Sequence, residues 1–263
     1  MEIKRDLLLK RLIDLRHNGM IKVITGMRRC GKSYLLFNLF TDALKAKGVD
    51  EENIVQINLE DRRNKSLRDP DKLLAYIDSR LKDNKMYYIL LDEVQLVNEF
   101  EDVLNSYLQV KNADVYVTGS NARFLSKDVI TEFRGRGLEI RVHPLSFSEI
   151  RGARPDEPIE QLWIEYITYG GLPQVITMNS DQEKVDYLKG LFKHTYLKDI
   201  KERYDIKLDG DLEELISTLA STVGGLTNPR KLADTFRTVK KSTISQDTIK
   251  VYIDYLQDAF IIE

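Results

Sequence analysis

The chain has 263 residues, and its 40 basic and 42 acidic residues give a formal net charge of −2 at pH 7. This balance gives no bulk charge that would demand a nucleic acid or a membrane as partner, so any basic surface is local. The single cysteine, Cys30, excludes an internal disulfide and fits a reducing compartment. No apolar run approaches the ~18 residues of a membrane span. We therefore predict a cytoplasmic protein with no membrane partner.

The first part of the chain alternates between strand and helix patterns. Leucine and isoleucine at helical spacing predict a first helix over residues 6–16. Short apolar runs predict strands over residues 21–25, 53–60, 86–93, 113–120 and 137–144. Helical patterns fall between them, over residues 33–47, 70–81 and 98–109. This alternation favours an α/β fold with a parallel sheet covered by helices on both faces.

After the fifth predicted strand the pattern becomes helical throughout. The stretch GARPDEP, residues 152–158, interrupts it with two prolines and a glycine and marks a predicted domain boundary. The predicted domains cover residues 1–151, 152–205 and 206–263. Asn228, before Pro229, and Ser245 are predicted N-caps of the last two helices. The final residues FIIE, 260–263, are predicted to begin a strand.

Residues 23–36, VITGMRRCGKSYLL, place two glycines, a lysine and a serine between a predicted strand and a predicted helix. Glycines let the backbone approach a phosphate, and the N–H groups of such a loop point at the anion. A lysine and a hydroxyl directly after the second glycine are typical of a loop that binds a nucleoside triphosphate with Mg²⁺. The residues assigned to nucleotide binding in this loop are Gly26, Arg28, Arg29, Cys30, Gly31, Lys32, Ser33 and Tyr34.

Some of these assignments have alternatives. The loop can be a glycine-rich turn with a surface lysine, although the strand before it and the helix after it favour the phosphate site. Arg28 and Arg29 either approach the phosphates or are solvated or ion-paired. Cys30 is expected to pack as a small residue, because no base beside it is predicted to activate the thiol.

Asp92 and Glu93 directly follow the apolar run YYILL of the third predicted strand. The carboxyl end of a parallel strand lies at the same sheet edge as the phosphate loop. Ser33 and Asp92 are therefore the predicted metal ligands, Asp92 through water, and Glu93 is predicted to orient and deprotonate an attacking water. The alternative is a solvated acidic pair at a strand end.

Polar residues also follow two other predicted strands. Ser120 or Asn121, in YVTGSN, contacts the γ-phosphate or the water unless GSN is only a turn. We assign Ser120 to the catalytic group together with Lys32 and Glu93. Asn58 either holds Glu93 in an idle position or forms a hydrogen bond at its own strand end, which is the favoured interpretation.

The segments GMRRCGKS, YYILLDEVQ, VYVTGSN, FRGRGLEIRVHPLSFSEI and YGGLPQV follow one another at fitting distances. Together they resemble the bacterial and archaeal AAA+ ATPases that carry an N-terminal ATPase domain and a C-terminal domain of unknown function related to restriction-type nucleases. The resemblance covers essentially the whole chain and stops where that C-terminal domain would begin. We therefore interpret the chain as a truncated member of this family.

The resemblance implies a P-loop NTPase core with sheet order 5-1-4-3-2, then an α-helical lid and a partial winged helix, in the three predicted domains. It implies that Pro173 packs on the nucleotide from the lid, the alternative being a plain turn between helices. It places at Arg136, or alternatively Arg134, a basic residue that stabilises γ-phosphate charge in the same or a neighbouring subunit, unless this arginine only forms an ion pair. The choice of ATP over GTP rests on the resemblance alone.

These observations predict a Mg²⁺-dependent ATPase whose hydrolysis of ATP moves the lid and the winged helix. The alternatives are a nucleotide-bound switch or DNA-associated scaffold with little turnover, and a small-molecule kinase, which needs neither Glu93 nor Pro173. The basic residues within 230–241 are a candidate DNA surface, but aspartates on the last helix oppose it, and an intramolecular role is preferred. The oligomeric state is left open.

Overall fold

The computed structural model describes residues 3–119, 133, 135–206, 209–240 and 244–262, without the side chains of residues 203, 209, 239 and 240. The chain divides into two compact units, Met1–Val185 and Asp186–Glu263, and each is described by itself. Three predicted site residues, Ser120, Asn121 and Arg134, lie outside the described residues.

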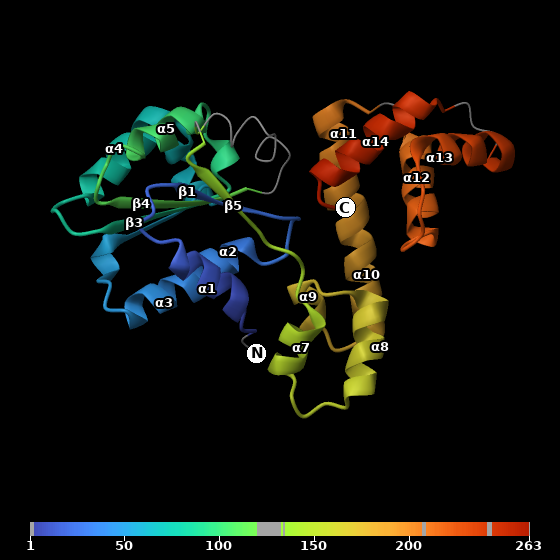
Figure 1. Cartoon of the computed structure of the whole chain (residues 1–263), viewed down its shortest axis with the longest axis horizontal. Helices are drawn as coiled ribbons and strands as arrows, with labels where there is room; N and C mark the ends of the chain where they lie inside the picture. The colour runs from blue at the N-terminus through green and yellow to red at the C-terminus, as the bar shows by residue number, and fades with distance from the viewer. Residues whose placement is uncertain (1–2, 120–132, 134, 207–208, 241–243, 263) are drawn as a thin grey trace. The chain divides into compact units, whose positions relative to one another are not determined.

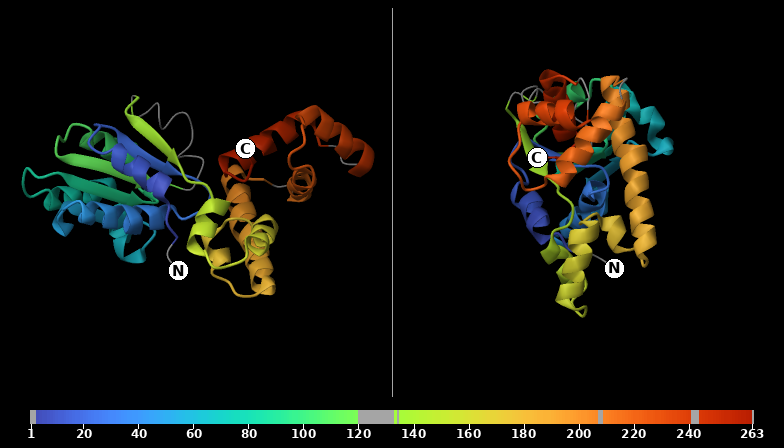
Figure 2. Two further views of the ribbon diagram at one scale, coloured as in Figure 1. Left: turned by 60° about the horizontal axis from the view of Figure 1, so that its bottom comes forward. Right: turned by 90° about the vertical axis from the view of Figure 1, so that its right-hand side faces the viewer.

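The first unit is built on a five-stranded sheet (Figure 1). In spatial order its strands are β2 (Ile54–Asn58), β3 (Tyr87–Asp92), β4 (Ala113–Thr118), β1 (Ile21–Thr25) and β5 (Gly137–Arg141). Read from β5, this is the order 5-1-4-3-2, which confirms the predicted topology. All neighbouring pairs are parallel, so every strand ends at the same edge of the sheet. The strands fan out with the twist expected of such a sheet (Figure 2, left).

Helices cover both faces of the sheet, as strands buried on both sides require. One face carries α4 (Pro70–Arg80) and α5 (Phe100–Tyr107) (Figure 1). The other carries α1 (Asp6–Asp14) and one continuous helical stretch made of α2 (Lys32–Tyr34), Leu35–Phe40 and α3 (Thr41–Ala46). Short 3₁₀ helices over Glu51–Asn53, Arg62–Arg68 and Val94–Leu96 were not expected from the sequence.

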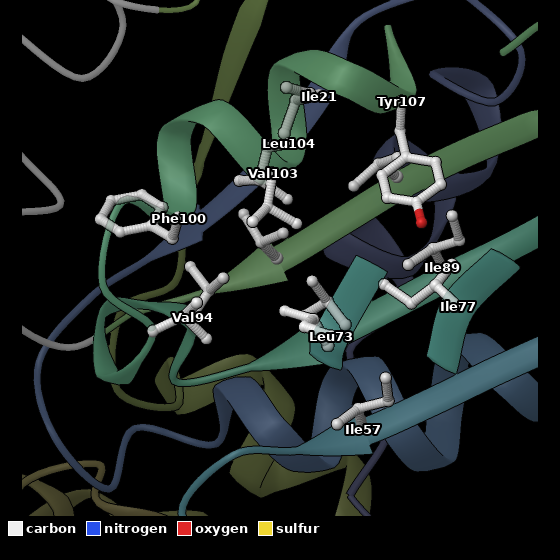
Figure 3. Close-up of a cluster of buried hydrophobic side chains, with 14 of the residues drawn as sticks. Ile21, Ile57, Leu73, Ile77, Ile89, Val94, Phe100, Val103, Leu104 and Tyr107 are labelled. Atoms are coloured by element: carbon white, nitrogen blue, oxygen red, sulfur yellow. The ribbon is translucent and has the colours of Figure 1, made fainter. Parts of the chain in front are cut away.

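Alternate residues of each strand supply the two cores. Ile89 of β3 packs with Leu73 and Ile77 of α4 in one cluster (Figure 3), whereas Tyr88 belongs with Phe40 to the cluster on the opposite face. Burying one such aliphatic or aromatic side chain contributes about 1.5–3 kcal/mol. The parallel direction of the strands, in turn, places the polar residues that follow them at one common edge.

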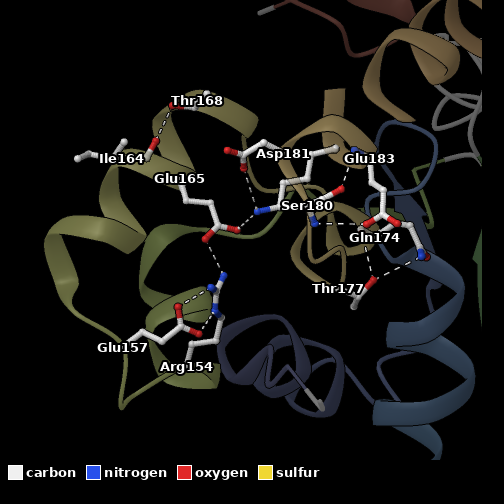
Figure 4. Close-up of polar contacts among 11 residues, drawn as sticks. Arg154, Glu157, Ile164, Glu165, Thr168, Gln174, Thr177, Ser180, Asp181 and Glu183 are labelled. Carbon is white, nitrogen blue, oxygen red and sulfur yellow. Dashed lines mark hydrogen bonds and ion pairs between the residues drawn. The ribbon is translucent and has the colours of Figure 1, made fainter. Parts of the chain in front are cut away.

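Three further helices follow the sheet within the first unit. They are α7 (Phe147–Ala153), α8 (Ile159–Tyr169) and α9 (Pro173–Ile176). The Ser146 hydroxyl caps α7 by accepting a hydrogen bond from the Glu149 N–H, and the Glu149 carboxylate accepts one from the Ser146 N–H. The Glu165 carboxylate of α8 accepts hydrogen bonds from Arg154 (3.0 Å) and Lys184 (2.8 Å), which ties α8 to the segments on either side (Figure 4).

The second unit is helical in its described residues. α10 (Asp181–Leu191) begins in the first unit and continues, from Asp186 in the second, through Phe192–Leu197 into α11 (Lys198–Tyr204). The helices that follow are α12 (Asp209–Ser221), α13 (Pro229–Thr235) with Phe236–Lys240, and α14 (Gln246–Asp258). Buried side chains from these helices form one apolar cluster, which includes Leu212, Leu215, Phe236, Ile249 and Leu256.

The ends of the last helices test several sequence predictions. The side chains of Asn228 and Ser245 accept hydrogen bonds from the N–H groups of Lys231 (2.8 Å) and Thr248 (3.0 Å), which confirms both N-caps. The strand predicted from residue 260 is wrong, because residues 260–262 follow α14 as a turn. Over the described part of the chain, we find no helix with the length and apolarity needed to span a membrane.

Candidate functional site

The loop between β1 and α2 contains two glycines, and at Gly26 it passes close to another backbone segment. A Cβ on Gly26 would lie 2.1 Å from the Val142 carbonyl oxygen, and φ is +139°, so a larger residue does not fit. Gly31 has φ +98° and directly precedes the helical stretch that begins at Lys32. The first N–H groups of that helix have no partner within the helix and point back toward the loop.

The Lys32 ammonium lies inside this loop. Its Nζ donates hydrogen bonds to the carbonyl oxygens of Gly26 (2.9 Å) and Met27 (3.1 Å), and the side chain is 4% exposed. A buried positive charge surrounded by loop backbone suits an anion, because phosphate oxygens are stronger partners for an ammonium than neutral carbonyls.

Asp92 joins the loop to the ends of two strands. Its Oδ1 accepts hydrogen bonds from Ser33 Oγ (2.9 Å) and Thr118 Oγ1 (2.6 Å), and Thr118 Oγ1 also accepts one from the Glu93 N–H (3.0 Å). Asp92 is 2% exposed. Burial raises the pKa of its carboxyl above the ordinary value, against the opposing effect of the Thr118 and Ser33 hydrogen bonds.

This set of oxygens fits Mg²⁺. A hydroxyl and a carboxylate are the kinds of ligand that hard divalent cations take in proteins. A nearby cation would also offset the cost of keeping the buried Asp92 carboxylate ionised. The predicted metal ligands Ser33 and Asp92 are thus brought into direct contact.

Glu93 adopts the left-handed backbone conformation at φ +55°. Its Oε2 accepts a hydrogen bond from Gln95 Nε2, a contact not expected from the sequence. Asn58 Oδ1 instead accepts hydrogen bonds from the N–H groups of Glu60 (2.8 Å) and Asp61 (3.2 Å). These bonds agree with the favoured interpretation of Asn58, since they close the turn at the end of its own strand.

The start of α9 lies beside the loop. The Pro173 Cγ is 3.6 Å from the position a Cβ on Gly31 would take, so the proline ring packs over that glycine. Gly171 packs directly against the backbone of Leu145, which follows β5. A Cβ on Gly171 would lie 2.0 Å from the Leu145 carbonyl oxygen, and the Gly171 carbonyl accepts a hydrogen bond from the Leu145 N–H at 2.7 Å. The structure thus brings the GGLP segment to the predicted phosphate loop.

Arg5 also contacts the loop, although nothing in the sequence singled it out. Its guanidinium donates to the carbonyl oxygens of Cys30 (3.1 Å) and His143 (2.9 Å) and to Glu149 Oε1 (3.0 Å), and the residue is 6% exposed. A buried guanidinium with these partners holds the loop against the end of β5 and α7. Thr118 was not expected either, because a threonine inside a strand has no pattern that distinguishes it.

The other predicted loop residues differ in exposure. Cys30 is buried, its Sγ donates to the Val142 carbonyl oxygen (3.2 Å), and burial raises the pKa of its thiol, which agrees with a packing role. Arg29 and Tyr34 are exposed, and Arg28 is half-buried.

Arg136 lies at the opposite edge of the sheet. Its carbonyl oxygen accepts the Ile21 N–H at the start of β1 (2.8 Å), and the loop follows the end of that strand. The two ends of this five-residue strand lie four steps apart, about 13 Å at ~3.3 Å per step. The structure therefore places the Arg136 backbone away from the loop of its own chain, and a role for Arg136, in the same or a neighbouring subunit, stays a prediction.

Comparison with known proteins gives a family match. Residues 18–151, slightly over half of the chain, match the family described as AAA domain, and residues 160–263 match a domain of unknown function (DUF8612). An uncharacterized protein of Haemophilus influenzae is 35% identical over 98% of this chain, and one of Methanocaldococcus jannaschii is 28% identical over 92%. The chain spans 65% and 55% of the length of these two relatives.

A solved structure shows a similar fold. The Aeropyrum pernix ORC2 protein, in ADPNP–ADP complexes, gives a TM-score of 0.50 at 12% identity, covering 98% of this chain and 84% of that chain. At this identity the similarity concerns the fold alone.

Proposed function

Because the chain belongs to the AAA domain family, we propose that it binds Mg²⁺–ATP at residues 26–33 and hydrolyses it to ADP and phosphate. The observation that carries this proposal is the hydrogen bond of 2.9 Å between Ser33 Oγ and Asp92 Oδ1. It joins the phosphate loop to the acidic end of β3, where a cation bound to a triphosphate needs oxygens from both sides.

The loop residues bind the phosphates. Backbone N–H groups between Gly26 and Ser33 surround them, and Lys32 exchanges its carbonyl partners for oxygens of the β- and γ-phosphates. Pro173 covers the nucleotide side of Gly31. Because phosphate carries full negative charge, each bond to Lys32 becomes charge-assisted and stronger than the bond it replaces.

The hydrolytic step uses the acidic end of β3. Mg²⁺, when bound through Ser33 and Asp92, supplies positive charge that stabilises the developing charge on the β- and γ-phosphate oxygens. Glu93 accepts a proton from the water that attacks the γ-phosphorus, and the bond from that phosphorus to the ADP oxygen breaks. Ser120, and Arg136 from a neighbouring subunit, complete the proposed catalytic group.

The test is phosphate release from ATP, with binding measured separately. Glu93→Gln should lower kcat by about 10²–10⁴-fold, the usual contribution of a general base, while the Kd for Mg²⁺–ATP stays within about threefold. Lys32→Ala should abolish binding. Glu60→Gln changes an exposed glutamate at the neighbouring strand end and is the matched control. Equal turnover in wild type and Glu93→Gln would refute the proposal, and tight binding without turnover would favour the switch.

A second candidate function, DNA binding by the second unit, has one supporting observation. Arg230 and Lys231 are exposed at the start of α13, next to the exposed Arg237. Against it, α14 carries Asp247 and Asp254, which repel phosphate. Fluorescence anisotropy with duplex DNA at two salt concentrations decides the matter, because binding by this surface must weaken with salt and be lost in Arg230→Glu/Lys231→Glu. For the main function, we propose that hydrolysis moves residues 152–205, acting as a lid, together with residues 206–263, acting as a winged helix.

A further inference from the structure

Gln95 contacts the carboxylate of Glu93 within one turn of the backbone. The residue lies in the 3₁₀ helix Val94–Leu96, and its Nε2 donates a hydrogen bond to Glu93 Oε2. The opposite orientation of the amide would place Gln95 Oε1 against the carboxylate, so the chemistry of the pair determines which atom faces it.

The other end of the same amide is unsatisfied. Gln95 Oε1 is buried, and no donor among the residues that the structure describes reaches it. A buried acceptor without a donor costs about 1–3 kcal/mol. An apolar residue of the same size would avoid this cost but would also lose the bond to Glu93, so the contact with that carboxylate is what the amide at this position provides.

Glu93 is constrained at its backbone as well. It stands at φ +55°, ψ +49°, a region that costs a residue with a Cβ about 1–2 kcal/mol, and its N–H donates to Thr118 Oγ1 (3.0 Å). Thr118 thus holds the main chain of Glu93, and Gln95 holds its carboxylate. Asn58, which the sequence offered as an alternative holder of Glu93 in an idle position, accepts hydrogen bonds within its own turn.

We propose that Gln95 is a positioning residue, whose side-chain amide orients the Glu93 carboxylate toward the attacking water. The proposal rests on the proposed function, in which Glu93 is the base. A base oriented by a third group is the general arrangement at sites that activate a nucleophile. Gln95 itself touches neither the nucleotide nor the water in this role.

Substitutions at residue 95 separate positioning from packing. Gln95→Met keeps the length of the side chain and removes the donor, so kcat should fall by about 10–100-fold, as for other residues that orient a catalytic group, with KM and the Kd for a non-hydrolysable ATP analogue nearly unchanged. Gln95→Glu, of the same shape but unable to donate when ionised, should lose kcat too. The control is Gln56→Met, because Gln56 Nε2 donates to the Phe37 carbonyl oxygen (3.1 Å) away from the loop.

Two further readouts exclude a merely structural effect. Thermal unfolding of Gln95→Met without nucleotide should show no loss of stability, since the substitution also removes the unsatisfied oxygen. The double variant Glu93→Gln/Gln95→Met should be no slower than Glu93→Gln alone, because a residue that acts through Glu93 has nothing left to orient.

A measurement without turnover tests the contact itself. The ¹⁵N–¹H signals of the Gln95 side-chain amide, assigned with Gln95→Met, should shift in Glu93→Ala and stay in place in Asn58→Ala. If the Gln95 amide signal does not shift in Glu93→Ala, the inference is overturned.

The kinetic outcomes distinguish the two proposals. A wild type that binds ATP without turnover counts against the proposed function and removes the role of Gln95 with it, because Glu93 then has no water to deprotonate. If wild type turns over and Glu93→Gln does not, an unchanged kcat in Gln95→Met overturns the role of Gln95 and leaves the proposed function intact.

Discussion

The ion pair between Lys22 of β1 and Asp114 of β4 is a sharp test of how the sheet is stabilised. Lys22 is 0% exposed, and its Nζ bonds to Asp114 Oδ1. Asp114 Oδ2 accepts further hydrogen bonds from the His17 N–H (3.1 Å) and the Tyr116 hydroxyl (3.0 Å). Breaking a buried pair by removing one partner costs about 3–5 kcal/mol, and the surroundings of each partner decide where in this range each variant falls.

Lys22→Met should cost about 3 kcal/mol of the free energy of unfolding, because the carboxylate keeps two donors that contribute about 1.5–3 kcal/mol each. Asp114→Leu should cost about 5 kcal/mol. In this variant, among the described contacts, the Lys22 ammonium keeps the face of the Tyr116 ring, whose centroid lies 4.9 Å from Nζ. The His17 N–H and the Tyr116 hydroxyl both lose their acceptor. The double variant Lys22→Met/Asp114→Leu should return to within about 1 kcal/mol of wild type, since neither charge remains.

The pH dependence of the free energy of unfolding gives a second test of this ion pair. Burial lowers the pKa of Lys22 below its ordinary 10.5, and Asp114 opposes that effect. Without Asp114 the folded pKa falls further, so the unfolded chain binds the proton more tightly and stability rises with pH up to about 10.5. Asp114→Leu should therefore regain stability toward alkaline pH, and Lys22→Met should not.

Urea unfolding followed by the fluorescence of Trp163, the single tryptophan, reports on the first unit, with circular dichroism for the whole chain. Single-variant costs below about 1 kcal/mol, or costs that simply add in the double variant, would refute this account of the pair.

Three other predictions concern residues around the site and the helices after the sheet. Asp92→Asn, without nucleotide, should raise the midpoint of thermal unfolding near neutral pH. Burial raises the pKa of the Asp92 carboxyl, so the wild type loses stability as pH rises through that pKa. The gain in the variant should vanish in acid, and a lower midpoint near neutral pH would contradict the prediction. Gly171→Ala should lower the free energy of unfolding by about 1–3 kcal/mol through overpacking. Gly152→Ala, where a Cβ would have nothing within 4 Å, should raise the free energy of unfolding by about 0.5–1 kcal/mol. Equal effects of the two variants in urea titrations would count against this geometry. Burial raises the pKa of Glu165, but hydrogen bonds led by that from Lys184 hold it below its ordinary 4.5. The stability that this group contributes above pH 4.5 is therefore lost as pH falls, and Glu165→Gln should make the free energy of unfolding depend less on pH in acid. An unchanged acid profile would exclude this role.

Local patterns were sufficient for most of the sheet. The strand predicted over residues 21–25 has those bounds in the structure, because an apolar run between a glycine turn and the phosphate loop has few other conformations. The strand predicted from residue 260 fails for the opposite reason. Phe-Ile-Ile has the composition of a strand, but a strand needs a neighbour to pair with, and the described residues there form a turn after α14.

The candidate site was predictable only in part. The spacing of Gly31, Lys32 and Ser33 and the position of Asp92 at a strand end follow from chemistry that is visible in the sequence. Arg5, Thr118 and Gln95 do not, because a buried arginine near the N-terminus, a threonine within a strand and a glutamine in a turn have no distinctive pattern of their own. Their roles depend on which backbone segments lie next to them.

By itself, the sequence determined the class of fold, the loop suited to phosphate and the acidic strand end, because each depends on residues close together along the chain. The tertiary structure alone decided that Thr118 and Ser33 share Asp92, that Pro173 packs over Gly31, and that Arg136 lies at the far edge of the sheet. These relations follow from strand order and register, which place residues tens of positions apart within hydrogen-bonding distance or at opposite ends of the same strands.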